Sequence, residues 1–360
     1  ENLVLGMTSR FLIKKVVHID LDLAGSIFTR DTRLKSILAD TSIIFLNKAE
    51  QIIPVRYSTH VSSAGKGVVG YMGKNFSLNG SYERIDPEYS SMGCFFFNND
   101  LENYTVSPSL NLAKSRLRLS GSYGIQRNNL LSNKEFRTSR TIGSVNLGFQ
   151  PNSKFAVDAN YTNYSLNQQS AKVLLNDTIR IANVNRNISV TPRYSITGTQ
   201  KVQTIMAIFN QQGLTDRNPF NRETNEVNTT FASLIYASTL LKTNQNLNIG
   251  LTYLTTKTAQ AEINSYGLSA GFSRNFLKNH VTFSCNESFS KNSLNAKNNG
   301  FNNSVNFSVS YQVNASQRLS LDCNYLTYNT IVQPSYSELR IVANYGLTLI
   351  PRKKNDSKKQ

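Results

Sequence analysis

The stretch "FNNSVNFSVSYQVNASQRLSLDCNY" occupies Phe301–Tyr325, and apolar and polar residues alternate strictly through most of it. Because successive side chains of a β-strand point to opposite sides, this period of two predicts strands with one apolar and one polar face. Two environments fit such faces. A soluble sheet places the apolar face on a core and the polar face in water, whereas a membrane barrel places them in lipid and in an aqueous lumen.

The same alternation recurs along nearly the whole chain. It is seen in "VVHIDLDLAGSIF", "YTVSPSLNL", "LRLSGSYGI", "VNLGF", "FAVDANY", "ISVTPRYSI", "LNIGLTY", "YGLSAGF" and "LRIVANYGLTL". Segments 201–211 and 227–241 alternate less cleanly, but their place in the series predicts strands there too. Most segments are about 10–13 residues long, and 9–11 tilted residues suffice to cross a bilayer.

Connections of two kinds separate these segments. Short polar ones fall near Lys14-Lys15, Lys74-Asn75, Lys114-Ser115, Pro151–Lys154, Gly198–Gln200, Lys242–Gln245, Leu277–Asn279 and Asn314–Gln317. Mostly longer ones fall between them, at 29–60, 87–102, 128–139, 166–183, 212–226, 258–263, 292–301 and 330–337. An alternation of short and longer connections predicts an up-and-down meander, and outer-membrane barrels combine short periplasmic turns with longer extracellular loops.

These observations favour an all-β, antiparallel up-and-down transmembrane β-barrel of about 16–18 strands. We expect the barrel to cover 1–350, with a long loop at 29–60 and a basic periplasmic tail at 351–360. The loop segment 31–60 could form a helix that caps the mouth, fold inward or hide an extra strand. A soluble sandwich or β-solenoid is the alternative, but a long meander would leave two open edges in water.

Composition excludes several classes of protein. The 360 residues carry a formal net charge of +17, and 39% of them are hydrophobic. No stretch approaches the roughly 20 apolar residues of a transmembrane helix, and no N-terminal signal peptide is visible. The charge is spread over turns and polar strand positions, without a recognition helix or RNP-like motif, so we expect no nucleic-acid partner. A basic surface also suits lipid phosphates.

Few residues have the spacing of a catalytic or metal site. The three cysteines, Cys94, Cys285 and Cys323, form no CxxC pattern, and the last two share the parity of apolar neighbours. The histidines are His18, His60 and His280, which are too scattered for a metal cluster. We therefore expect no cofactor and no metal.

One motif, "GLSAG" at Gly267–Gly271, matches the G-x-S-x-G nucleophile elbow. Alternation continues straight through it, so Ser269 is predicted to be a polar-face residue in mid-strand rather than a nucleophile on a strand-to-helix turn. The chain is therefore not expected to be an enzyme.

Charged residues of inward parity are the candidate lumen residues. They are Arg10, Asp20, Asp22, Arg118, Asp158, Arg193, Asp322 and Arg340. If Ile13 faces Val17, Arg10 lies opposite Asp20 in the first hairpin. These charges either neutralise one another across the lumen or form an ion-selective conduit. The candidate lipid-facing residues are Val305, Phe307, Val309, Tyr311, Leu319, Leu321 and Cys323.

The stretches "NGSYERIDPEYSSMGCFFFNNDLENYTVSPSLNL" and "SYGIQRNNL", with their Asn/Ser/Thr-rich hairpins, resemble large outer-membrane β-barrel proteins of Bacteroidota. The resemblance covers nearly the whole chain and implies a location in the bacterial outer membrane. It transfers no catalytic residue. Bacterial barrels commonly end on an aromatic residue, whereas this chain has "NYGLTLI" followed by a charged tail.

The functional hypothesis is a barrel for transport, secretion or assembly of surface components, acting as a subunit of a larger complex. Its expected partners are outer-membrane lipid, lipopolysaccharide and other outer-membrane or periplasmic proteins. The alternatives are a passive porin-like channel, a secreted all-β adhesin or surface-binding protein, and a lipid hydrolase. With strand 3–13 running toward a tight turn, Glu1 would lie outside, which predicts that the sequence is the C-terminal portion of a longer barrel.

Overall fold

The computed structural model describes residues 1–36, 53–93, 98–170, 180–314, 316–330 and 334–348. The chain divides into two compact units. The N-terminal unit comprises 1–150, 158–188 and 213–226, and the C-terminal unit comprises 151–157, 189–212 and 227–360.

Seventeen strands are found in the described residues. They are β1 (Asn2–Ile13), β2 (Val17–Thr29), β3 (Thr59–Met72), β4 (Phe76–Ile85), β5 (Leu101–Leu112), β6 (Leu117–Asn128), β7 (Phe136–Phe149), β8 (Phe155–Ser170), β9 (Ala182–Thr197), β10 (Lys201–Asp216), β11 (Val227–Leu240), β12 (Gln245–Thr258), β13 (Glu262–Phe276), β14 (Val281–Leu294), β15 (Lys297–Asn314), β16 (Gln317–Asn329) and β17 (Tyr336–Leu347). Helical structure in this part of the chain is limited to α2 (Arg222–Asn225) and the 3₁₀ turn η2 (Leu277–Asn279). Neither is long or apolar enough to cross a membrane.

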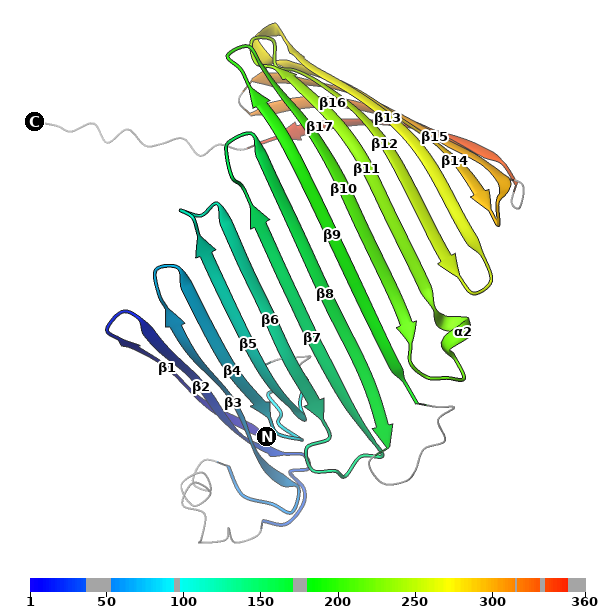
Figure 1. Ribbon diagram of the computed structural model, residues 1–360. Coiled ribbons are helices and arrows are strands. Elements are labelled where there is room, and N and C mark those ends of the chain that lie inside the picture. The colour runs from blue at the N-terminus through cyan, green and yellow to red at the C-terminus, as the bar shows by residue number, and fades with distance from the viewer. Residues whose placement is uncertain (37–52, 94–97, 171–179, 315, 331–333, 349–360) are drawn as a thin grey trace, which may run out of the picture. The chain divides into compact units, whose positions relative to one another are not determined.

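Consecutive strands pair antiparallel within each unit. In the N-terminal unit the pairing runs in chain order from β1 to β7 (Figure 1). In the C-terminal unit it runs from β11 to β17. The predicted all-β, antiparallel, up-and-down fold is therefore confirmed. Strands β10 and β11 also confirm the predictions for 201–211 and 227–241.

The tight turns have the backbone geometry that hairpins require. Lys14 and Lys15 between β1 and β2 both have positive φ, at 49° and 57°. Asn295 and Ala296 between β14 and β15 also have positive φ, at 49° and 62°. Two successive residues with positive φ give a type I′ turn, whose twist matches that of the flanking strands.

The predicted alternation of short and longer connections holds for the N-terminal unit but is wrong at two places in the C-terminal unit. Strands β12 and β13 are joined by 259–261, and β14 and β15 by 295–296, so neither 258–263 nor 292–301 is a longer loop. The strands extend instead, because the turn at Asn295 closes the hairpin early and a bulge between Lys291 and Ser293 absorbs one residue.

Three predictions fall on residues that the structure does not describe, or describes only in part. In the long loop, 37–52 lies outside the described residues, and an isolated bridge between Ser36 and Arg56 flanks it. Strand β3 begins at Thr59, inside the loop range predicted to end at residue 60. The basic tail and Cys94 also lie outside the described residues.

Very little of the apolar surface is buried. Among the described residues, the buried hydrophobic side chains are those of Ile27, Ile53, Val55, Leu101, Ala156, Ala182 and Val184. Large apolar side chains are instead exposed on nearly every strand. A soluble two-layer sheet would cover this face with a second layer, so the apolar stripes need another environment.

Candidate functional site

The polar face of the N-terminal unit carries a continuous row of polar and charged residues. Following the register from β1 to β7, the row is Thr8, Asp22, Lys66, Glu83, Asn103, Gln126 and Arg140. Opposite charges are neighbours on adjacent strands, with Asp22 opposite Lys66 and Lys66 opposite Glu83. At the far end, Arg140 donates a hydrogen bond to Gln126 at 3.2 Å. The row presents fixed charges of both signs.

Four of the predicted inward-facing charges come together in two pairs, of which only Arg10 with Asp20 was predicted as a pair. Arg10 lies opposite Asp20, as predicted, and its Nε lies 2.6 Å from Asp20 Oδ1. Arg118 and Asp158 meet over Gly148, where a Cβ would lie 3.5 Å from Asp158 Oδ1 and 3.6 Å from Arg118 Nε. Both side chains therefore lie within van der Waals distance of the same point above Gly148, which places them near each other.

The polar face of the C-terminal unit is mostly uncharged. A row across β12 to β17 contains Asn248, Gly271, Asn286, Asn306, Asn324 and Arg340. Asn306 donates a hydrogen bond to Asn324 within this row. One row away, Asp322 accepts hydrogen bonds from Ser308 at 2.6 Å and from Asn344 at 3.3 Å. The carboxylate is thus held by neutral donors rather than by a cation.

Of the remaining predicted charges, Asp22 lies opposite Lys66 and Asp322 is held by neutral donors, whereas Arg193 and Arg340 have no charged partner among the described residues. Arg340 lies opposite Asn324. In β9, Arg193 precedes the exposed Tyr194, so their side chains point to opposite faces of the strand. In the described part of the chain, neither arginine forms an ion pair with a predicted aspartate. Of the eight predicted charges, the structure therefore joins Arg10 with Asp20 and brings Arg118 near Asp158.

A loop folds over one end of the polar face in the N-terminal unit. Ser90, in the β4–β5 connection, accepts hydrogen bonds at its carbonyl from Ser26 at 2.5 Å and from Asn2 at 3.1 Å. Asn2 Oδ1 in turn accepts a bond from the Met92 amide at 3.1 Å. Because Asn2 and Ser26 share the face of Arg10, the connection is tied across that face at the longer-loop end of β1 and β2.

A second loop is held by a buried carboxylate that sequence reasoning missed. Asp100 is 1% exposed, accepts bonds from the amides of Asn129 and Leu130, and pairs with Lys134 Nζ at 2.5 Å. Asn129 is fully buried and bonds to the Phe136 carbonyl. The adjacent polar residues at 98–100 and 128–129 were the available signal, but only the fold brings them together.

Close to the end of β4, Asp86 accepts hydrogen bonds from Ser63 and Arg84. Burial acts to raise the pKa of Asp86, but the bonds from Ser63 and Arg84 outweigh it, and the pKa is lowered from its ordinary value. The carboxylate is thus kept ionised, and its hydrogen bond holds the Arg84 side chain at the end of β4.

The candidate lipid-facing residues share one face of the C-terminal unit. Tyr311 lies opposite Leu319, Val309 opposite Leu321, and Phe307 opposite Cys323, with Val305 next in the same series. Neighbouring strands extend this face, on which Leu251, Leu268 and Ile341 are 55%, 52% and 61% exposed. Phe283 packs edge-on against Phe307 with ring centroids 5.1 Å apart. The result is a broad exposed apolar surface.

One charge interrupts this apolar surface in mid-strand. Glu287 of β14 lies between Ala270 on β13 and Val305 on β15, and Cys285 and Phe289 flank it along its own strand. It is exposed. Among the described residues, no ion pair or hydrogen bond of its carboxylate is found. In the sequence, Glu287 lies an even number of residues from Phe283 and Phe289, and this spacing could have revealed a charge on the apolar face.

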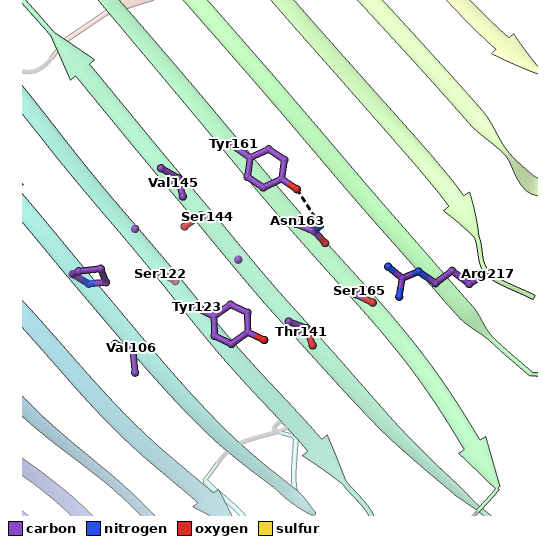
Figure 2. Close-up of a pocket in the computed structure, with 13 residues that line it drawn as sticks. Val106, Ser122, Tyr123, Thr141, Ser144, Val145, Tyr161, Asn163, Ser165 and Arg217 are labelled. Atoms are coloured by element: carbon purple, nitrogen blue, oxygen red, sulfur yellow. Dashed lines mark hydrogen bonds between the residues drawn. The ribbon is translucent and has the colours of Figure 1, made fainter.

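The apolar face of the N-terminal unit contains two grooves, separated by a polar cluster. The first groove, lined by β5–β8 residues and Arg217, has a volume of about 760 Å³ (Figure 2). The second, lined by residues of β1–β4, has a volume of about 680 Å³. Between them Glu102, 4% exposed, accepts bonds from Tyr82 and Tyr104 and pairs with Arg127.

Other candidate chemistry has no support among the described residues. No group of three or more histidine, cysteine, aspartate or glutamate side chains there could hold a metal ion. Ser269 lies in the middle of β13, opposite Gly250 and Ser288, as predicted. Cys285 and Cys323 are free thiols on either side of Phe307.

The two-faced antiparallel sheet defines the class of fold, and comparisons with known proteins go little further. No family model matches the chain, and no curated protein is similar to it in sequence. Among solved structures, the fold is similar to that of OccAB4 from Acinetobacter baumannii, with 12% identity, a TM-score of 0.44, and coverage of 96% of this chain and 89% of that one.

Two further solved structures are similar at the same level. OpdK of Pseudomonas aeruginosa, solved with vanillate, has 9% identity, a TM-score of 0.42, and coverage of 96% of this chain and 92% of that one. The alcaligin outer-membrane receptor FauA of Bordetella pertussis has 10% identity, a TM-score of 0.43, and coverage of 94% of this chain and 64% of that one. Such values assign neither a family nor a function.

Proposed function

We propose that this chain forms an integral β-barrel of the bacterial outer membrane and acts in transport, secretion or assembly of surface components. The observation that supports this most strongly is the exposed apolar face, which continues from strand to strand while the opposite face is polar. Soluble monomers rarely expose contiguous apolar patches larger than a few hundred Å². A bilayer removes that cost, and closure of the sheet removes its edges.

In this proposal the apolar face meets outer-membrane lipid and lipopolysaccharide, and the polar face lines a water-filled lumen. The resemblance of the hairpins to barrels of Bacteroidota suggests the source. Membrane fractionation with heat-modifiable gel mobility tests the proposal. We expect the protein in the outer-membrane fraction and a mobility shift on boiling. A soluble protein without a shift, elongated in scattering, would favour the secreted adhesin instead.

Glu287 favours action as a subunit of a larger complex. An intramembrane ionisable residue is costly in lipid and marks a functional contact by default, so a partner in the membrane that offers a donor to Glu287 would relieve the cost. We expect a partner identified by co-purification to be lost from Glu287→Leu and retained by the matched variant Glu262→Leu at a strand end. Equal recovery with both variants would argue against this role.

A porin-like channel is the second candidate, and the charged row Asp22–Lys66–Glu83 with the loop tied at Ser90 favours it. Fixed charges and a loop over the polar face are features that regulate ion passage. Conductance of the purified protein in planar bilayers would support the channel. Electrical silence with stable co-purifying partners would favour the subunit.

A further inference from the structure

The larger groove on the apolar face of the N-terminal unit has a floor of small residues. Pro108, Gly121, Gly143 and Ser165 line it from four adjacent strands, and Figure 2 shows the groove residues distributed over these strands. A Cβ placed on Gly143 would approach no closer than 3.8 Å to Tyr123. A methyl group at this position would thus make ordinary van der Waals contact with Tyr123 and would displace no neighbouring atom.

Larger side chains form the walls of the groove. Val106, Tyr123, Val145 and Tyr161 rise around the small floor, and Asn163 donates a hydrogen bond to the Tyr161 hydroxyl at 3.1 Å. The volume of about 760 Å³ falls in the roughly 300–1,000 Å³ range of ligand sites. The lining is apolar apart from a few hydroxyl and amide groups, so it suits an aliphatic chain.

A single cation lies at one end of the groove. Arg217 follows β10 at the longer-loop end, and Figure 2 shows its side chain extending toward Ser165. The residue is exposed. Within the described ranges, no ion pair or hydrogen bond of the Arg217 guanidinium is found. Its charge is therefore available to an anion at the end of the groove, and guanidinium is well suited to phosphate.

The second groove provides an internal comparison. It has a similar volume, about 680 Å³, and a similar floor that includes Gly25, Ser63 and Gly65. It also has an arginine, Arg84, but that guanidinium is held by Asp86 at 3.0 Å. The two grooves thus match in size and apolar character and differ in whether their arginine is already paired.

We propose that the groove over β5–β8 binds one anionic, phosphate-bearing membrane lipid, with an acyl chain on the glycine floor and the phosphate at Arg217. The inference rests on the proposed function, since it requires this face to lie in a membrane. An amphiphile with one anionic end matches an apolar trough that has one free cation at its interfacial end. The groove over β1–β4 takes lipid chains without selecting their charge.

The absence of tryptophan from the sequence allows a direct test. Tyr161→Trp places a single fluorophore in the first groove, and Leu23→Trp places one in the second. Each protein is reconstituted in phosphatidylcholine vesicles that contain either brominated phosphatidylglycerol or brominated phosphatidylcholine as the quencher. We expect Tyr161→Trp to prefer the brominated phosphatidylglycerol about fivefold, the value for roughly 1 kcal/mol per basic residue at an anionic surface.

The preference should disappear when Arg217→Gln is added and should be absent in Leu23→Trp. Quenching of both tryptophans to the same extent by both lipids would overturn the inference while leaving the membrane location intact. No quenching by either lipid at both positions would contradict the proposed function itself. Gly143→Leu, which fills the floor, should lower the lipid preference of Tyr161→Trp without changing that of Leu23→Trp.

Discussion

The polar faces of the two units are built from different chemistry on the same kind of sheet. The N-terminal unit sets Asp22, Lys66 and Glu83 side by side, whereas the C-terminal unit repeats asparagine across four strands and holds Asp322 with neutral donors. Alternation needs only that the second face be polar. If both faces line a lumen, as proposed, the fixed charges would act on passing ions, whereas the neutral amides would only exchange hydrogen bonds with water.

The largest expected effect tests whether the two faces of the C-terminal unit lie in lipid and in water. Leu321→Arg places a charge on the apolar face and should lower the free energy of unfolding by roughly 2–4 kcal/mol if the site is near the bilayer midplane. Ser320→Arg, its neighbour on the polar face, should cost far less. Urea-induced unfolding in lipid vesicles measures both. Equal losses would mean that the two faces are not lipid and water.

The tied loop distinguishes the N-terminal unit from the short hairpins of the C-terminal unit. Ser26→Ala removes the donor to the Ser90 carbonyl, and loss of about one hydrogen bond should raise amide exchange at 90–92 roughly tenfold. Exchange at the β14–β15 turn near Asn295 should not change. Unaltered exchange at 90–92 would show that other contacts hold the loop.

The contrast in charge predicts a difference in ion selectivity. Lys66→Glu makes the row in the N-terminal unit acidic and should shift the cation-to-anion permeability ratio by about fivefold, the effect of about 1 kcal/mol between charges near water. Asn306→Gln, a neutral change in the C-terminal row, should leave the ratio unchanged. Reversal potentials in planar bilayers measure both. An equal shift for the two variants would contradict the inference that the polar faces of the two units differ in their effect on ions.

The smallest expected effect is a pH dependence at the rim of the N-terminal unit. The lowered pKa of Asp86 means that its stabilisation is present above the unfolded value, near 4, and is lost as the pH falls through the folded value. Exchange protection of the Ser63 amide, which donates to Asp86, should fall in that window. In Asp86→Asn the protection should no longer depend on pH there.

Periodicity was enough to predict the strands and the first hairpin. The pattern around Ile13 and Val17 sets the register that places Arg10 opposite Asp20. Periodicity did not predict which residues share a face in strands whose two faces have similar composition. In β7, Thr141 lies on the apolar face opposite Ile125, and Ile142 lies on the polar face opposite Gly124. Pairing with β6 decides this register, and the residues of β7 alone do not.

Features made from distant segments could not be predicted from sequence. Asp100 and Lys134 come together only because two loops share one end of the sheet. The groove above Gly143 is formed by residues of four strands that lie next to one another only in the folded sheet. The loop length predicted at 292–301 was wrong because polar residues such as Asn298 and Asn299 extend β15. The length at 258–263 was wrong because β12 continues to Thr258 and β13 begins at Glu262.

Collision of spin labels with oxygen and with a water-soluble nickel chelate tests the central claim most directly. In a background without the three native cysteines, single labels are placed along β15 from Val305 to Tyr311 in protein reconstituted in vesicles. The account predicts a period of two, with oxygen collisions highest at Val305, Phe307, Val309 and Tyr311 and nickel collisions highest at the positions between them. In-phase profiles, or nickel collisions that are equal on both faces, would contradict it.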